Sequence, residues 1–141
     1  MKVAWIDDEI PKLDSQVKTL QLLGHQVFAF QRTKDFLEWL DRVDDASVDS
    51  FFVDLMMKID EESLPRLSSI SERKLLGEFD TGMLLIGAIR EKFPDKPILA
   101  LTVVSNPPKE VFSSDKRIRF IHKLARIKPA LDAVTKLMEA K

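Results

Sequence analysis

Five short runs of apolar, β-forming residues alternate along this chain with stretches in which apolar residues recur every three to four positions. The runs predict strands, and the stretches between them, such as the one that carries Phe36, Leu37 and Leu40, predict amphipathic helices. The predicted strands are residues 2–6, 26–30, 50–53, 98–102 and 118–121. Parallel neighbours need a crossover connection, so this alternation predicts an α/β fold with a parallel sheet and helices on both faces.

The order of the strands can also be predicted. The first and third runs are mostly apolar, and the fourth, Ile98-Leu99-Ala100-Leu101, is wholly apolar, as expected for strands buried in the centre of a sheet. A doubly wound sheet of five parallel strands commonly takes the flavodoxin-like order 2-1-3-4-5, which leaves a crevice at the carboxyl ends of strands one and three. We expect that order, with the functional site in the crevice.

Glycine and proline residues mark the element boundaries. Gly24 stands where a first helix over 11–23 would need a left-handed cap, and Pro94 and Pro97 separate a third helix from the fourth strand. Residues 58–81 form a connection far longer than the roughly two to six residues usual between a strand and a helix. We interpret 58–81 as an inserted loop or short helix within a single domain of residues 1–141.

Composition excludes several classes of function. The chain has 22 basic and 23 acidic residues, so its net charge of −1 gives no reason to expect a nucleic-acid or membrane partner. It has no cysteine, which excludes disulfides, thiolate nucleophiles and Cys-ligated zinc. The longest apolar runs are too short to cross a bilayer, and Asp7 interrupts the first run before a signal peptide could form. We expect a cytoplasmic protein.

Polar side chains follow the carboxyl ends of four predicted strands. They are Asp7, Asp8 and Glu9 after strand one, Asp54 after strand three, Thr102 at the end of strand four and Lys123 after strand five. The carboxyl ends of parallel strands share one edge of the sheet, so these side chains should gather there. Clustered carboxylates repel one another unless a cation lies among them, and Mg²⁺ takes carboxylate, water and phosphate oxygens as ligands. Lys123 would add a positive charge for an incoming anion, and Thr102 a hydroxyl donor.

These residues, in this order, resemble the receiver domain of two-component response regulators, and the resemblance covers the chain apart from the insertion. It implies that Asp54 accepts a phosphoryl group from a histidine kinase or phosphotransfer protein, with Mg²⁺ as cofactor. It also implies a phosphorelay switch that acts on a downstream protein target and is no enzyme beyond its own phosphotransfer and slow autodephosphorylation. The kinase, the target, the pathway and any homodimer stay open.

The resemblance assigns the metal ligands. Asp8, Asp54 and the backbone carbonyl of Met56 would bind Mg²⁺ directly, and Asp7 would act through a coordinated water. In receivers, the residues two positions after the phosphoacceptor and two positions after the strand-four Thr flank the path of the hydrolytic water. Here they are Met56 and Val104, whose apolar side chains cannot orient water, so we expect a long-lived phosphoryl group.

The resemblance also assigns a switch. Thr102 and Lys123 would contact phosphoryl oxygens, and Phe120 matches the aromatic residue that turns inward as the strand-four Thr moves. Two positions depart from the family pattern. Lys58 stands where a Pro is frequent after the phosphoacceptor, and Leu124 replaces the Pro that generally follows the strand-five Lys.

Two other interpretations remain open. The chain could be a phosphorylation-independent pseudo-receiver, a binding module that acts through the insertion. Partner binding lost on deletion of 59–79, with phosphorylation intact, would favour that reading. It could also be a Mg²⁺-dependent phosphohydrolase, although Asp54-Leu55-Met56 lacks the second Asp two positions later that such enzymes use as acid and base. Taken singly, Asp54 could be a helix cap, and Asp7-Asp8-Glu9 a solvated loop.

Overall fold

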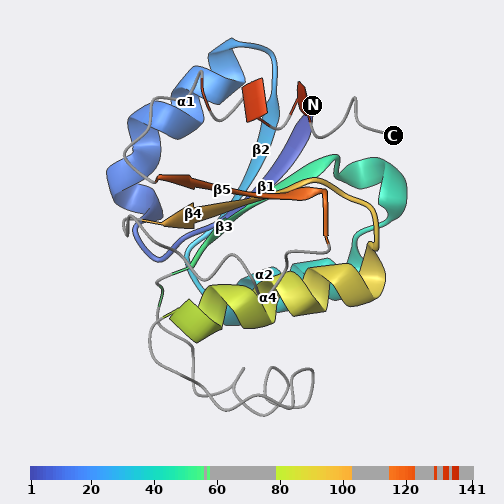
Figure 1. The fold of residues 1–141 in the computed structure, drawn as a ribbon. Helices are drawn as coiled ribbons and strands as arrows, with labels where there is room; N and C mark the ends of the chain where they lie inside the picture. Colours follow the sequence, from blue (N-terminus) through green and yellow to red (C-terminus); the bar gives the residue numbers. More distant parts are fainter. Residues whose placement is uncertain are drawn as a thin grey trace.

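The computed structural model of the chain describes residues 1–55, 57, 79–102, 115–122, 129, 132–133 and 135–136. It contains one sheet of five parallel strands in the order β2-β1-β3-β4-β5 (Figure 1). The strands are β1 (Lys2–Ile6), β2 (Gln26–Phe30), β3 (Ser50–Asp54), β4 (Ile98–Thr102) and β5 (Ile118–His122). The predicted fold class and strand order are confirmed, and β3 and β5 each run one residue beyond their predicted ends.

The helices connect the strands as expected, with one difference at the first. They are α1 (Asp14–Leu22), α2 (Thr33–Arg42) and α4 (Phe79–Lys92), with short 3₁₀ helices at Ile10–Leu13 and Asp45–Ser47. The single helix predicted over 11–23 is wrong in its first turn. There the amides of Ile10 and Lys12 donate to the carbonyls of Asp7 and Glu9 at 3.2 and 2.8 Å, and these three-residue steps wind the chain as a 3₁₀ turn before α1.

Two other predicted boundaries can be compared with the structure. Gly24 has φ of 91°, which confirms the left-handed cap after α1. Helix α4 begins at Phe79, so the last three residues of the predicted insertion 58–81 lie in a helix, and 58–78 lie outside the described residues. None of the helices among the described residues is both long enough and apolar enough to cross a membrane.

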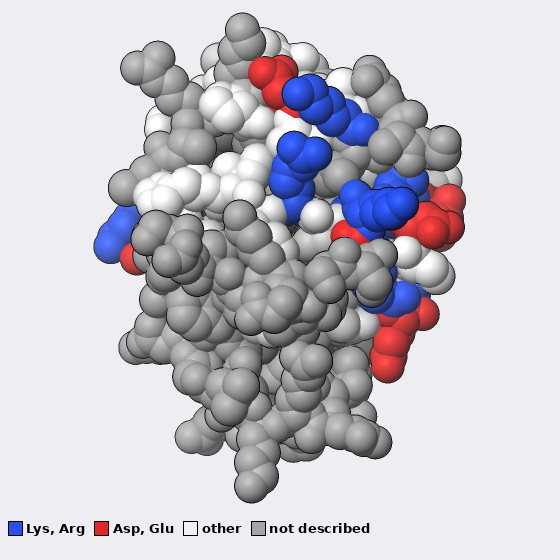
Figure 2. All heavy atoms as spheres, viewed as in Figure 1, with Lys and Arg blue, Asp and Glu red and all other residues white. Residues whose placement is uncertain are grey.

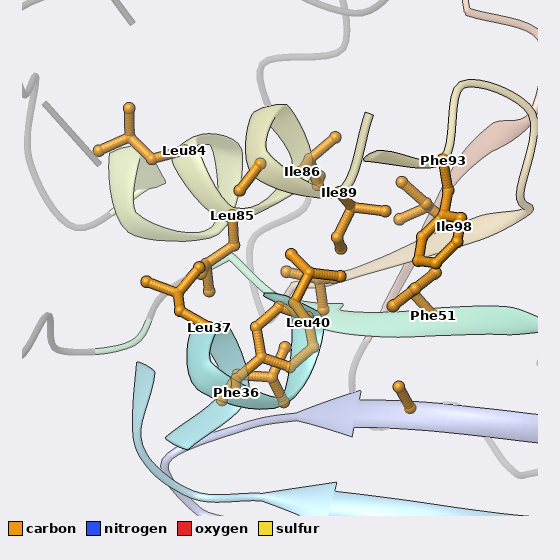
Figure 3. Packing of buried hydrophobic residues seen from close by; sticks show 14 of the residues in the cluster. Phe36, Leu37, Leu40, Phe51, Leu84, Leu85, Ile86, Ile89, Phe93 and Ile98 are labelled. Atoms are coloured by element: carbon orange, nitrogen blue, oxygen red, sulfur yellow. The ribbon is translucent and has the colours of Figure 1, made fainter. Parts of the chain in front are cut away.

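The sheet separates two hydrophobic cores. Successive side chains of a strand point to opposite faces, and the central strands therefore supply both cores alternately. The larger core packs under α2 and α4 and takes Ala4, Ile6, Phe51, Val53, Ile98 and Ala100 from the strands. The smaller core lies on the α1 face and takes Val3, Trp5, Phe52, Leu99 and Leu101. In Figure 3, side chains of α2 and α4, including Leu40 and Ile89, converge over Phe51.

Each core contains one tryptophan. On the smaller core, the ring of Trp5 meets the ring of Phe52 edge to face, with centroids 5.3 Å apart. On the larger core, Trp39 packs against Phe30 and Phe28, with centroid distances of 5.1 and 5.5 Å. The sheet lies between the two tryptophans, because they belong to opposite faces.

An arginine links the end of α4 to the edge of the sheet. Arg90 Nε lies 2.5 Å from Asp115 Oδ2, and the two side chains are only 14% and 23% exposed. The same guanidinium donates to the carbonyls of Phe93 and Lys96 at 3.1 and 2.7 Å. The side chain of Arg90 thus forms hydrogen bonds both with the loop before β4 and with the turn before β5.

Candidate functional site

The site begins where β1 and β3 end side by side. In the parallel register Ile6 lies opposite Val53, so Asp7 follows one strand where Asp54 ends the other. Asp7 is completely buried, Asp54 is 1% exposed, and Asp8 is half-buried beside them. One carboxylate oxygen from each of the three residues lies within 4.8 Å of the other two. The structure therefore brings together three of the four carboxylates that the sequence placed at this edge, whereas Glu9 is solvent-exposed and lies outside the group.

Backbone contacts fix the loop that carries Asp7 and Asp8. The amide of Asp7 donates to the carbonyl of Phe30 on β2 at 3.0 Å. The Asp7 Oδ1 atom accepts the amide of Glu9 at 2.8 Å, which holds the carboxylate in one orientation at the end of β1. Gln31 Nε2 donates to the Asp8 carbonyl at 3.3 Å. The acidic loop is thereby attached to the neighbouring strand on its outer side.

The three carboxylates form an electrostatically costly group. Two full negative charges about 5 Å apart repel by roughly 3 kcal/mol at an effective dielectric constant near 20. Burial of Asp7 and Asp54 removes the water that would otherwise screen this repulsion. A cation among the carboxylates would offset it, and the donor set, made of carboxylate oxygens alone, is that of a hard divalent ion.

The spacing of the oxygens is compatible with such an ion. Ligands on opposite sides of Mg²⁺ lie roughly 4.2 Å apart, twice the usual metal–oxygen distance of about 2.1 Å. One oxygen from each of Asp7, Asp8 and Asp54 lies within 4.8 Å of the others, a limit that is comparable with this distance. The residues present therefore fit Mg²⁺, and they would also fit Ca²⁺, which takes the same oxygen ligands at longer distances.

The remaining predicted site residues come from the other half of the sheet. Thr102 is the last residue of β4, is 3% exposed and lies opposite His122 in the parallel register. Phe120 lies on β5 opposite Ala100 and packs, partly buried, against the larger core. The predicted metal ligand Met56, the predicted phosphoryl contact Lys123, and Val104 lie outside the described residues.

One residue near the site was missed by sequence reasoning. A Cβ atom at Gly82, in the first part of α4, would lie 2.6 Å from the carbonyl oxygen of Asp54 and 2.5 Å from Cα of Leu55. Such distances are far below van der Waals contact, so only glycine allows α4 to approach the end of β3 this closely.

Comparison with solved structures gives many receiver domains and comparison by sequence gives none. Vibrio cholerae chemotaxis protein CheY4 has a TM-score of 0.69 and 19% identity, over 96% of this chain and 97% of that one. A response regulator receiver domain protein from Clostridium thermocellum has a TM-score of 0.70 and 16% identity, over 98% and 94%. A Burkholderia pseudomallei response regulator, with a phosphorylated aspartic acid, a calcium ion and citrate, has a TM-score of 0.68 and 19% identity, over 98% and 69%.

No family model matches the sequence, and no curated protein matches it either. Identities below 20% carry information about the fold alone, but the match extends over nearly the whole chain and includes the strand order described above. This protein has the fold of the response-regulator receiver domain.

Proposed function

We propose that this chain is the phosphoacceptor switch of a phosphorelay, with Asp54 as the residue that becomes phosphorylated. The observation that carries the proposal is the position of the Asp54 carboxylate. It is 1% exposed at the end of a central strand and lies within 4.8 Å of Asp7 and Asp8. The phosphorylated aspartic acid and calcium ion in the Burkholderia pseudomallei response regulator support it by analogy of fold.

In the proposed reaction an Asp54 carboxylate oxygen attacks phosphorus in a phosphohistidine of a kinase or phosphotransfer protein. A bond forms between that oxygen and phosphorus, the bond between phosphorus and the histidine nitrogen breaks, and the imidazole keeps the electron pair and takes up a proton. Asp7, Asp8, Asp54 and the Met56 carbonyl would hold Mg²⁺. When bound, it would neutralise charge on the carboxylates and the phosphoryl oxygens.

The other residues act once the phosphoryl group is in place. The hydroxyl of Thr102 would donate to one phosphoryl oxygen, and the ammonium of Lys123 would pair with another. Movement of Thr102 would leave room for Phe120, which would then shift from one rotamer to another and change the surface around β5. The output is a contact with a downstream protein in the cytoplasm, and the chain performs no catalysis beyond its own phosphorylation and slow dephosphorylation.

Phosphorylation by a small phosphodonor tests the proposal directly. The wild-type chain is incubated with acetyl phosphate and Mg²⁺, and its intact mass is measured before and after treatment with base. We expect the mass of one added phosphoryl group, stable in acid and removed by base, because the product is an acyl phosphate. Peptide mapping after borohydride reduction should place the modification on Asp54.

Two variants sharpen the result. Asp54→Asn should stay unmodified, whereas Asp95→Asn, a change of the same charge at an exposed aspartate of the loop before β4, should be labelled like wild type. An unmodified wild-type chain, under conditions that label a known receiver, would refute the proposal. Equal labelling of Asp54→Asn would move the modification to another residue and refute the assignment of Asp54.

A further inference from the structure

A pocket of about 300 Å³ opens at the amino-terminal ends of the strands, which is the opposite end of the sheet from the acidic cluster. It is bounded by Asp49 before β3, by the segment that connects α4 to β4, and by Arg117 before β5. In Figure 1 this is the end of the sheet away from the arrowheads of β4 and β5. The pocket is therefore separate from the proposed phosphorylation site and needs a ligand chemistry of its own.

The side chain of Arg117 is the reason to expect a ligand in this pocket. Its backbone is well connected, with the amide on Asp115 Oδ1 at 3.0 Å and the carbonyl accepting the amide of Ile98 at 2.9 Å. Its Nε atom, however, is buried and has no hydrogen-bond partner in the described part of the chain. A guanidinium whose Nε is neither hydrated nor hydrogen-bonded is poorly solvated, so an anion paired with its terminal nitrogens would stabilise the positive charge.

The two lysines of the pocket donate to backbone carbonyl groups. Lys92 Nζ donates to the carbonyl of Leu40 at 2.5 Å, where α2 ends. Lys96 Nζ donates to the carbonyls of Asp45 and Val48, both at 2.7 Å. Both amines add positive charge to the pocket, and the planar donor fork of Arg117 is the group whose geometry matches two oxygens at once.

The carboxylates that line the pocket leave room for an anion. Asp45 forms an ion pair with Lys96 at 3.2 Å and is otherwise solvent-exposed, and Asp49 accepts the amide of Lys2 at 2.6 Å. Asp95 lies in an exposed turn, where water screens its charge. Figure 2 shows basic and acidic side chains intermixed on the described part of the face it displays, so recognition has to depend on local geometry.

We propose that this pocket binds a small organic oxyanion, a carboxylate or phosphate monoester with an apolar body, through bidentate contact with Arg117. The two terminal nitrogens of a guanidinium match two oxygens of either group. The apolar body would pack on Phe93, Pro94 and Pro97, which line the pocket. The two proline rings restrict the backbone of this segment. The volume exceeds that of a bare anion and lies at the lower end for small-molecule sites.

Nuclear magnetic resonance of the full chain tests this proposal. Benzoate and phenyl phosphate are titrated separately while the Nε–Hε signal of Arg117 is followed, in EDTA so that no divalent ion can bring the anion to the acidic cluster. At least one probe should shift that signal saturably, and the one that binds more tightly identifies the oxyanion. Acetate and inorganic phosphate, which lack the ring, should bind more weakly because they leave the apolar wall bare.

Variants decide whether Arg117 is responsible. Arg117→Gln should weaken binding at least about tenfold, and Arg117→Lys should weaken it almost as far, since it keeps the charge and loses the fork. Lys116→Gln, the same charge change at the exposed neighbour, should bind like wild type. Absence of a saturable shift with both probes, unchanged affinity in a folded Arg117 variant, or equally tight binding of acetate and inorganic phosphate would each overturn the proposal. The outcome is independent of whether Asp54 is phosphorylated.

Discussion

Gly82 acts on the candidate site through the side chain that it lacks. The atoms that a Cβ would meet, the carbonyl oxygen of Asp54 and Cα of Leu55, belong to the backbone and cannot rotate away. Any substitution must therefore move α4 away from β3 or displace the end of β3, which carries the Asp54 carboxylate. Either movement changes the distances within the acidic cluster.

Gly82→Ala should weaken Mg²⁺ binding about tenfold or more and destabilise the fold by about 1–3 kcal/mol, as expected for a side chain forced into a packed region. Mg²⁺ titration by calorimetry measures the first effect and urea unfolding the second. Gly24→Ala is the control, because φ of 91° makes alanine cost about 1–2 kcal/mol there while a Cβ touches nothing within 4 Å. Equal metal affinity in both variants would show that Gly82 matters only for packing.

The individual site residues differ in how far the sequence could reveal them. Asp7, Asp54 and Thr102 could be predicted, because each comes directly at the end of an apolar run and such ends share one edge of a parallel sheet. Gly82 could not, because its importance depends on how closely a helix approaches a strand far away in the sequence. The unsatisfied Nε of Arg117 is a similar case, since burial of one atom is a property of the packed molecule.

At the scale of elements, Arg90 joins three segments that the sheet alone would hold less firmly. It belongs to the last turn of α4, contacts the loop before β4 through two carbonyls, and pairs with Asp115 ahead of the edge strand β5. An edge strand has hydrogen-bonded neighbours on one side only, so its attachment depends more on such side chains. These contacts of Arg90, together called the Arg90 clamp, also reach the pocket, because Arg90 Nη2 lies 3.5 Å from the carbonyl oxygen of Arg117.

Arg90→Met, which keeps most of the aliphatic length, should lower the free energy of unfolding by about 2–4 kcal/mol, because it leaves Asp115 Oδ2 and two carbonyls without the donor that Arg90 supplies. Exchange of the Ile98 amide, which donates to the Arg117 carbonyl at 2.9 Å, should accelerate more than exchange in β1. Arg119→Met, at an exposed position of β5, should change stability by less than about 0.5 kcal/mol. A similar loss in both variants would contradict the clamp.

Periodicity alone predicted the elements well and their ends less well. The strand runs of the sequence matched the observed strands to within one residue, because buried parallel strands need unbroken apolar runs. The first helix was predicted as one piece, although backbone hydrogen bonds from the acidic loop wind its first turn as a 3₁₀ helix. Such bonds depend on where Asp7 is anchored against β2, which a local pattern does not contain.

At the scale of the whole molecule, the acidic cluster lowers the stability of the fold, whereas the two cores raise it. Burial of apolar side chains on both faces of the sheet stabilises the fold, whereas the approach of Asp7, Asp8 and Asp54 costs electrostatic energy. The arrangement is typical of a chain that sacrifices stability at a functional site and recovers it when a ligand binds. The overall stability of this protein should therefore depend on divalent cations.

In EDTA, Asp8→Asn should be more stable than wild type by about 1 kcal/mol, because one repelling charge is gone from a half-buried position. Mg²⁺ at about 100 times its dissociation constant should raise the wild-type free energy of unfolding by about 2.7 kcal/mol and should leave Asp8→Asn nearly unchanged. Urea unfolding measures both differences. If Asp95→Asn reproduced the behaviour of Asp8→Asn, the effect would reflect net charge and the cluster would not be the cause.

The fold as a whole was within reach of the sequence, since five apolar runs separated by helical spacing leave few other solutions for 141 residues. The same topology predicted that the site lies at the carboxyl ends of the strands. What remained out of reach were the contacts between elements distant in sequence, namely the Gly82 approach, the Arg90 clamp and the pocket around Arg117. These depend on packing geometry, which periodicity does not encode.

The two tryptophans on opposite faces of the sheet provide intrinsic fluorescence that can report on the two cores separately. Trp5 comes two residues before Asp7, and its ring touches Phe52, two residues before Asp54, so it is coupled to both strands that end in the acidic cluster. Trp39 reports on the opposite core, among Phe28 and Phe30. A Trp39→Phe chain would carry one native fluorophore next to the site, and its emission could follow cation binding and phosphorylation without any added label.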